Sequence, residues 1–388
     1  MNLSDSFAID VHAPWVKKHN AEARQVLEAY HADHPIRVPL LCDESWLQHG
    51  PYADEVDLDY RIYYTDPDEM LRVQLEAAKW RREQPIYDFI LGKAPDRWTV
   101  TVDLWPAPVS GWVGCELLYR KDTVIAHRPL NLSKAECREL AMPDPYSGGI
   151  LTTYRAFWDY LKEQYEGKLE FLGRSVGPIA HGVDTYGFFA LALHVRGSEI
   201  MSDLYDDPPF ARGFLRKLAE WCDVLERTWR PLEGRELGPV SITDHGIDML
   251  SPGLYEEFIV PITFEMSARR GIPPSTSLHH CGRGAHLFPV MKQHFGLTSM
   301  HALTFPLLDI ARVRAEIGQE AWIMAVIEDS IVRFGPTEHI RQTVKNLMES
   351  GAKGQGRFAL IVGDMLRGTP IEHRTALYES VKEFGKYS

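Results

Sequence analysis

Short apolar runs alternate with longer amphipathic segments along most of the chain. The short runs have the length and composition of buried strands, whereas the longer segments repeat their apolar positions at helical spacing. We predict strands at residues 38–42, 98–104, 169–176, 239–243, 275–281, 297–303, 321–327 and 357–363. Strands that alternate with helices favour a parallel α/β sheet, and eight such units predict a (β/α)₈ barrel of the TIM type.

Two segments depart from this alternation. Residues 1–36 are polar, helical in pattern and without a strand, so we expect an N-terminal helical extension. Residues 105–150 hold a turn-rich stretch and a short predicted hairpin. We interpret them as an insertion after the second strand, on the face where barrel loops vary most. No linker or repeat is evident, so residues 1–388 are expected to form a single domain.

Charge and apolar content narrow the class of protein. The formal net charge of −12 argues against a nucleic-acid partner, which requires a basic face. The longest apolar run is too short for a membrane span, which needs about 18 residues. A cytoplasmic location is expected, because the start of the chain lacks a signal-peptide pattern and the cysteines are odd in number and scattered. They are Cys42, Cys115, Cys137, Cys222 and Cys281.

The segment Ser277-Leu278-His279-His280-Cys281-Gly282 carries the sharpest chemical signal. Side chains alternate between the two faces of a strand, so His279 and Cys281 should point one way and His280 the other. Imidazole and thiolate are both good zinc ligands, so this pair predicts a metal site. The alternative is a buried cysteine beside a structural histidine.

Other polar residues follow the predicted strands, where the active sites of barrel enzymes lie. We expect catalytic roles for some and substrate contacts for others. The candidates for catalysis are Asp103, Asp244, His245 and Glu328. The candidates for substrate binding are His181, Tyr186 and Trp105. Each could instead cap a loop, pack in the insertion or remain solvated at the surface.

From about residue 200 onwards the chain resembles the uroporphyrinogen decarboxylase superfamily. The stretches that carry the resemblance include ITDHGIDMLSPGLYEEFIVPI, SLHHCGRGAHLFPVMKQHFGL and RFALIVGDMLRGTPIEHRTALYESVKEFGKY. One branch of this superfamily decarboxylates uroporphyrinogen without a cofactor. Another contains zinc methyltransferases that work with corrinoid proteins and use H-x-C plus a distant cysteine. The related cobalamin-independent methionine synthase adds a glutamate on the strand after H-x-C.

The chain departs from both branches. The decarboxylase's arginine-rich loop is replaced by RVPLLCDESWLQHG, and its late Gly-His-Gly by Gly363-Asp364-Met365, so turnover of uroporphyrinogen is not expected. Asp103 lies about where the decarboxylase keeps its essential aspartate. The distant cysteine of the methyltransferases is absent, but Asp364 stands at its expected position. His301 stands about where the synthase supplies its glutamate.

The resemblance therefore implies a metal site formed by His279, Cys281, His301 and Asp364. Zinc is the first expectation, although this harder ligand set also suits other divalent metals. The leading hypothesis is a metal-dependent methyltransferase that moves a methyl group between a small-molecule substrate and a corrinoid protein or thiol. The alternatives are a cofactor-free decarboxylase or lyase acting on a carboxylic acid, and a non-catalytic ligand-binding barrel. The sequence leaves a corrinoid protein partner and a homodimer open.

Overall fold

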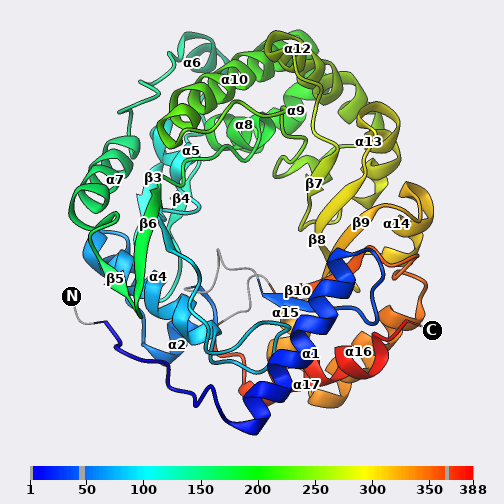
Figure 1. The fold of residues 1–388 in the computed structure, drawn as a ribbon. Coiled ribbons are helices and arrows are strands. Elements are labelled where there is room, and N and C mark those ends of the chain that lie inside the picture. Colours follow the sequence, from blue (N-terminus) through cyan, green and yellow to red (C-terminus); the bar gives the residue numbers. More distant parts are fainter. Residues whose placement is uncertain (1–2, 43–48, 363–366, 388) are drawn as a thin grey trace.

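The computed structural model describes residues 3–42, 49–362 and 367–387. Its strands surround the centre of a ring, and helices cover the outside (Figure 1). This is the arrangement of strands and helices in a (β/α)₈ barrel. The strands are β1 Leu40–Cys42, β2 Trp98–Thr101, β3 Glu116–Leu118, β4 Ala126–Arg128, β5 Glu170–Phe171, β6 Arg174–Ala180, β7 Ser277–His279, β8 Ser299–Phe305, β9 Trp322–Ile327 and β10 Phe358–Val362.

Most of the ring is built by parallel strands. One sheet has the order β1-β10-β9-β8-β7, and all of its pairs are parallel. A second sheet has the order β2-β6-β5, in which β2 and β6 are parallel. Because parallel strands end on the same side, the residues that follow them meet at one mouth of the ring.

The predicted strand at 169–176 is in fact a tight hairpin and the start of a longer strand. β5 runs antiparallel to β6, and β6 continues to Ala180. The turn consists of Leu172 (φ 47°) and Gly173 (φ 71°). Two consecutive positive φ values match the turn that the strand twist favours in two-residue hairpins. The prediction missed this turn because leucine rarely adopts a positive φ.

The predicted strand at 239–243 is an extended segment without a ladder. The Ser275 N–H donates to Val240 O (2.9 Å), the His279 N–H donates to Thr243 Oγ1 (2.9 Å), and the His245 N–H donates to Tyr186 O (3.0 Å). The segment therefore fills the place of the fourth strand, between β7 and the loop after β6. The strand prediction was wrong in its hydrogen bonding: Pro239 has no N–H, and a side chain replaces one backbone contact.

Within the described residues, no ladder joins β1 to β2, although the sequence predicts a closed barrel. Two side chains and one backbone N–H satisfy the two facing edges instead. The Gln74 amide donates to Thr101 O (2.7 Å) and accepts from the Thr101 N–H (3.0 Å). At the other edge, the Leu40 N–H donates to the Asp88 carboxylate (2.8 Å), and the Asp88 N–H donates to Leu40 O (2.9 Å). We call this place the β1–β2 seam.

Helices follow the strands and bury their apolar faces against the ring. In α10, Phe214, Leu218, Trp221 and Leu225 recur at helical spacing and are buried. The longer helices are α1 Pro14–His31, α4 Pro67–Arg81, α7 Leu151–Tyr165, α8 Phe188–Arg196, α9 Glu199–Asp206, α10 Pro208–Trp229, α12 Val260–Arg270, α13 Phe288–Phe295, α14 Ile310–Ile317, α16 Thr337–Glu349 and α17 Ile371–Phe384. The shorter ones are α2 Pro51–Glu55, α3 Tyr60–Tyr63, α5 Pro108–Trp112, α6 Lys134–Glu139, α11 Pro252–Leu254 and α15 Asp329–Phe334. No helix among the described residues is both long and apolar enough to cross a membrane.

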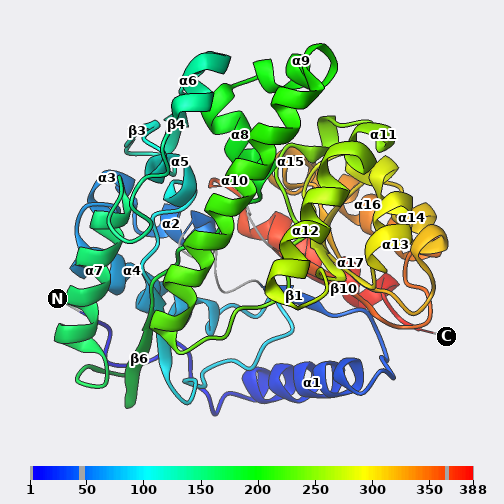
Figure 2. The same cartoon turned by 90° about the horizontal axis from the view of Figure 1, so that it is seen from above.

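The extension and the insertion lie at opposite ends of the ring. Figure 2 shows α1 on one side and β3, β4 and α6 on the other. The predicted helical extension corresponds to α1, whose Tyr30 hydroxyl accepts a hydrogen bond from the Trp322 indole. The predicted hairpin of the insertion corresponds to β3 and β4, which pair antiparallel from Glu116 with Arg128.

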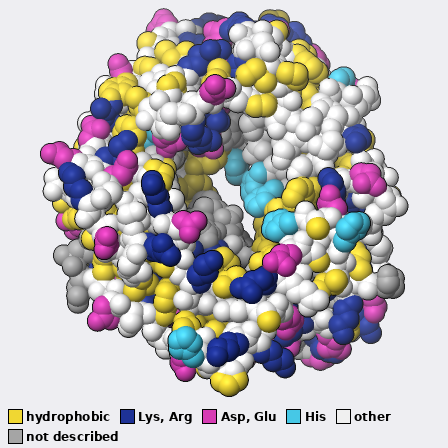
Figure 3. Space-filling model, in the orientation of Figure 1, with side chains coloured by type: hydrophobic (Ala, Val, Ile, Leu, Met, Phe, Trp, Pro, Cys, Tyr) yellow, Lys and Arg dark blue, Asp and Glu magenta, His cyan; other side chains and the backbone are white. Residues whose placement is uncertain are grey.

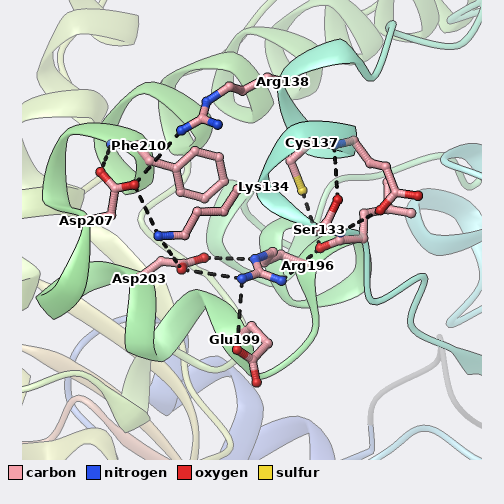
Figure 4. A network of polar contacts seen from close by, with 11 residues as sticks. Ser133, Lys134, Cys137, Arg138, Arg196, Glu199, Asp203, Asp207 and Phe210 are labelled. Atoms are coloured by element: carbon pink, nitrogen blue, oxygen red, sulfur yellow. Dashed lines mark hydrogen bonds and ion pairs between the residues drawn. The ribbon is translucent and has the colours of Figure 1, made fainter.

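A polar network fixes the insertion to the helices of the ring (Figure 4). Lys134 in α6 contacts both Asp203 and Asp207 at 3.1 Å. Arg196 in α8 binds Asp203 (2.8 Å) and donates to Leu132 O (2.9 Å). Asp203 is buried, so its charge is balanced by two cations rather than by water. The insertion is therefore attached to α8, α9 and α10 at a defined position.

Candidate functional site

Two histidine rings face each other across β7 and β8. His279 and His301 pair in register, and their Nδ1 atoms lie 2.8 Å apart. The ring centroids are 5.1 Å apart and both side chains are half-buried. Two lone pairs at this distance repel each other, so the pair requires either a shared proton or a cation between the nitrogens. The structure thus brings together the two histidines predicted as metal ligands.

A bulge in β8 lies directly beside His301. The register between β8 and β9 shifts between Met300 and Leu303, and Ala302 has a φ of 65°. A residue with a Cβ in this region carries about 1–2 kcal/mol of strain. Bulges re-aim the side chains next to them. The bulge that orients the His301 ring is therefore present despite the backbone strain at Ala302.

Cys281 lies just beyond β7 and lines a cavity of about 120 Å³ together with His279, Asp244 and His245. Its side chain is exposed. His280 also borders this cavity, but it is buried and its Nε2 accepts a hydrogen bond from the Gly284 N–H (2.8 Å). Burial lowers the pKa of His280, against an opposing effect of Asp248. The neutral His280 ring therefore supports the loop that carries Cys281.

The donor types suit a transition metal. Two imidazoles bound to one tetrahedral zinc would hold their nitrogens about 3.3 Å apart, so the 2.8 Å pair would open slightly to accept the ion. Within the described residues, no group of three His, Cys, Asp or Glu side chains converges closely enough to hold a metal. Asp364, the predicted fourth ligand, lies outside the described residues.

Asp244, in the wall of this cavity, caps the start of a helix. Its two carboxyl oxygens accept hydrogen bonds from the Phe189 and Ala190 N–H groups at the start of α8, both at 2.8 Å. Burial raises the pKa of Asp244 to about 8, although backbone N–H groups from Phe189, Ala190 and His245 act in the opposite direction. The carboxyl group is occupied by the backbone, so it positions α8 and the neighbouring His245 rather than facing a ligand.

His245 is exposed, like Cys281 on the same cavity. Its ring is edge-on to Tyr186 (5.4 Å between centroids) and 6.3 Å from the His279 ring. Desolvation lowers the pKa of His245, and Asp248 opposes that shift. A neutral imidazole at neutral pH can accept a proton, so His245 remains a candidate acid or base.

A second cavity, of about 500 Å³, follows β2 along the inside of the ring. Residues from both faces of the β2 segment line it, and the polar ones among them are Arg97, Thr99, Thr101 and Asp103. Histidine side chains gather on one wall of the central hollow in Figure 3. The interior of this barrel is therefore polar, although barrel interiors are usually filled by branched apolar side chains.

Asp103 is held at the end of this cavity by aromatic residues. Tyr63 Oη donates to Asp103 Oδ2 (2.7 Å), and His49 Nε2 lies 2.8 Å from the same oxygen. The His49 ring stacks on Tyr60, with 5.6 Å between centroids. Burial and the nearby Asp103 charge raise the pKa of Tyr63 well above its ordinary value, so its hydroxyl remains a donor. The sequence gives no signal for His49 or Tyr63, because neither directly follows a predicted strand.

The remaining candidates occupy different places. Tyr186 and Trp105 line the 500 Å³ cavity, as expected for substrate contacts. His181 does not border either cavity: it is buried, its Nε2 lies 3.0 Å from Trp229 O, and its Nδ1 accepts from the Val183 N–H (3.0 Å). Both ring nitrogens serve the backbone, so His181 supports the loop after β6. Glu328 precedes α15 and accepts from the Ser330 hydroxyl (2.9 Å), away from both cavities.

Comparisons with known proteins agree with this architecture. No curated protein matches the chain. A solved structure, a methyltransferase from Methanosarcina mazei, is similar over 93% of this chain and 98% of its own, with a TM-score of 0.59 and 16% sequence identity. This similarity shows the fold. The family described as uroporphyrinogen decarboxylase (URO-D) matches residues 108–384. The match covers most of the chain and includes both histidines of the facing pair; the chain belongs to the uroporphyrinogen decarboxylase family.

Proposed function

We propose that this chain is a methyltransferase that binds a divalent metal, zinc in the first instance, at the His279–His301 pair. Cys281 is proposed as a further ligand that would move toward the pair on binding, because no three of the described side chains converge on one point in this structure. The observation that carries the proposal is the approach of the His279 and His301 Nδ1 atoms to 2.8 Å. A cation is one of the two species that such a pair can accommodate, and Cys281 lines the same 120 Å³ cavity as His279. Asp364 is proposed as the fourth ligand on the grounds of sequence position alone.

A bound zinc ion would supply Lewis acidity, which activates a thiol acceptor or polarises the bond to a methyl group. The residues of the chain itself orient the site. The Thr243 hydroxyl accepts from the His279 N–H (2.9 Å), and His301 O accepts from the His280 N–H (3.0 Å). These bonds fix both backbones at the facing pair. His245, neutral at neutral pH, stands beside them as a proton acceptor.

The methyl acceptor is proposed to be a thiol or the corrinoid of a partner protein. Two findings support this: the chain belongs to the uroporphyrinogen decarboxylase family, and a methyltransferase of known structure shares its fold. A small-molecule donor would enter by the 500 Å³ cavity, because Tyr186 lines that cavity and contacts the His245 ring from the other side. The Tyr186 ring, which lines the larger cavity, therefore contacts the His245 ring, which lines the smaller one.

Metal content after reconstitution tests the proposal. Wild-type protein purified without an affinity tag should retain about one zinc per chain after dialysis. Cys281→Ser and His279→Gln should each lose most of it while the circular dichroism spectrum is unchanged, because a core of this size does not depend on one ion. His12→Gln, an exposed histidine in the extension, is the matched control and should retain the metal. Equal content in all four proteins, or none in the wild type with zinc, manganese or iron, would contradict the site.

Asp103 supports a second candidate, a cofactor-free decarboxylase or lyase. Its carboxylate lies at the end of the 500 Å³ cavity and is aligned by Tyr63 and His49. A carboxylate so placed can stabilise positive charge that develops on a substrate. Turnover of a carboxylic acid that survives metal removal but is abolished in Asp103→Asn would favour this reaction over methyl transfer.

A further inference from the structure

A groove between two outer helices is separate from the candidate site. It lies between α6 of the insertion and the first half of α10, and its volume is about 300 Å³. None of its lining residues borders either cavity described above. We call it the α6–α10 groove. Its lining residues are Cys137 and Arg138 from α6, and Pro209, Phe210, Gly213, Phe214 and Lys217 from α10.

Gly213 lies inside the 22-residue helix α10 and lines this groove. Glycine is the poorest helix former after proline, so its presence inside a long helix calls for a reason. The fold does not supply one, because the φ of Gly213 is not positive and a Cβ added there would have nothing within 4 Å. What this glycine provides is bare backbone, which lets another molecule approach the helix closely.

The apolar part of the groove is held in place by the core of the protein. The Phe210 and Phe214 rings stack, with 5.6 Å between centroids and an interplanar angle of 8°. The two residues are only 8% and 4% exposed, so packing fixes their positions. Pro209 adds a rigid apolar ring at the start of α10. An apolar ligand would therefore bury surface here at little cost in side-chain ordering.

The edge of the groove carries two cations that the chain neutralises only in part. In the network of Figure 4, Asp207 lies 3.1 Å from Lys134 but 3.9 Å from Arg138, whose side chain is 61% exposed. The Lys217 ammonium donates to two carbonyl oxygens at the end of α6 (both 3.1 Å) and has no carboxylate partner in the described part of the chain. This edge is therefore cationic, although the net charge of the chain is −12.

We propose that the α6–α10 groove binds a small organic acid with a flat apolar body. Its carboxylate pairs with Arg138, because a guanidinium can bind a carboxylate through two parallel hydrogen bonds. Its body lies against Gly213 and Phe210; the Arg138 guanidinium is 5.1 Å from the centroid of the Phe210 ring, so the charged and apolar contacts adjoin. Asp207 keeps Lys134 as its closer partner. The proposal does not depend on methyl transfer or on the metal.

Ligand-observed NMR titration tests the groove without any turnover. The probes are 3-phenylpropionate, its neutral amide, and propionate. The first should bind saturably and the other two about tenfold more weakly, because one lacks the charge and the other lacks the ring. Arg138→Gln should weaken 3-phenylpropionate by about tenfold, and Arg138→Lys by less, because lysine retains the charge but not the planar fork. Arg227→Gln is the matched control, since it removes an ion-paired arginine of α10 outside the groove, and it should leave binding unchanged.

Gly213→Leu separates a binding role of this glycine from a structural one. The added side chain should fill the groove and abolish binding of 3-phenylpropionate, while the Tm rises by about 1 °C, because leucine favours the helix and its Cβ meets no neighbour. Gly253→Leu, the same change at another open helical glycine, should leave binding intact. The proposal is overturned if 3-phenylpropionate shows no saturable binding up to about 10 mM, if the neutral amide binds equally well, or if binding survives in Gly213→Leu.

Discussion

Gly187 is the position at which one added methyl group should disturb the site most directly. Its φ is 95°, and a Cβ built there would overlap the carboxyl group of Asp244. In Gly187→Ala, the backbone strain costs about 1–2 kcal/mol. Displacement of Asp244 would break its bonds to the Phe189 and Ala190 N–H groups, at about 1 kcal/mol each. The expected loss of stability is therefore about 3–4 kcal/mol.

Thermal unfolding converts this loss into a measurable shift. The unfolding entropy of a chain of this length is about 0.8 kcal/mol/K, so the Tm should fall by about 4–5 °C at a fixed scan rate. Gly253→Ala is the control, because nothing lies within 4 Å of its added Cβ and its φ is not positive. Its Tm should stay within about 1 °C of the wild type. A Gly187→Ala protein as stable as Gly253→Ala would refute the assignment of Asp244 as the cap of α8.

Two further changes test the parts of the fold that position the site. In Asp244→Asn, the titrating group is removed. The pKa of Asp244 in the folded protein, about 8, lies above the ordinary 3.8, so the stability of the wild type relative to this variant should fall as pH rises from about 4 to 8, by up to about 1.4 kcal/mol per pH unit. Urea unfolding midpoints of both proteins at about pH 5 and pH 8 measure this change. A stability difference that is the same at both pH values would contradict the raised pKa. Gln74→Met should lower the free energy of unfolding by about 2–3 kcal/mol, because the N–H and C=O of Thr101 at the β1–β2 seam both lose their partner. Urea unfolding measures this loss. A loss below about 0.5 kcal/mol would show that solvent replaces the amide.

The sequence predicted the elements whose signal is local. Apolar runs located the strands of the five-stranded sheet. His279 and Cys281 do line one cavity, but His280, expected on the opposite face, borders the same cavity. The segment at 239–243 was predicted as a strand because apolar and polar residues alternate in it. Its backbone partners depend on the neighbouring segments and on Pro239, which a pattern of apolar residues does not report.

The site was less predictable where residues distant in the sequence meet. His301 could be proposed only from a family resemblance, and its distance from His279 depends on the register of two strands and a bulge at Ala302. Asp103 was identified, but its partners His49 and Tyr63 come from segments without a strand signal. His181 and Asp244 have the residue types of catalytic groups, yet their hydrogen bonds go to the backbone.

The pairing of β1 with β10 has a consequence for how the chain reaches this structure. Leu40 pairs with Leu360, 320 residues later, whereas among the described residues no ladder joins β1 to β2, the next strand in the sequence. During synthesis, β1 can therefore contact Asp88 early, but it meets its strand partner only when nearly the whole chain has been made. Contacts of such long separation form slowly and leave an apolar edge exposed in the meantime. Refolding of the intact chain should accordingly be slow and prone to aggregation, with the closure of β1 onto β10 among its last steps.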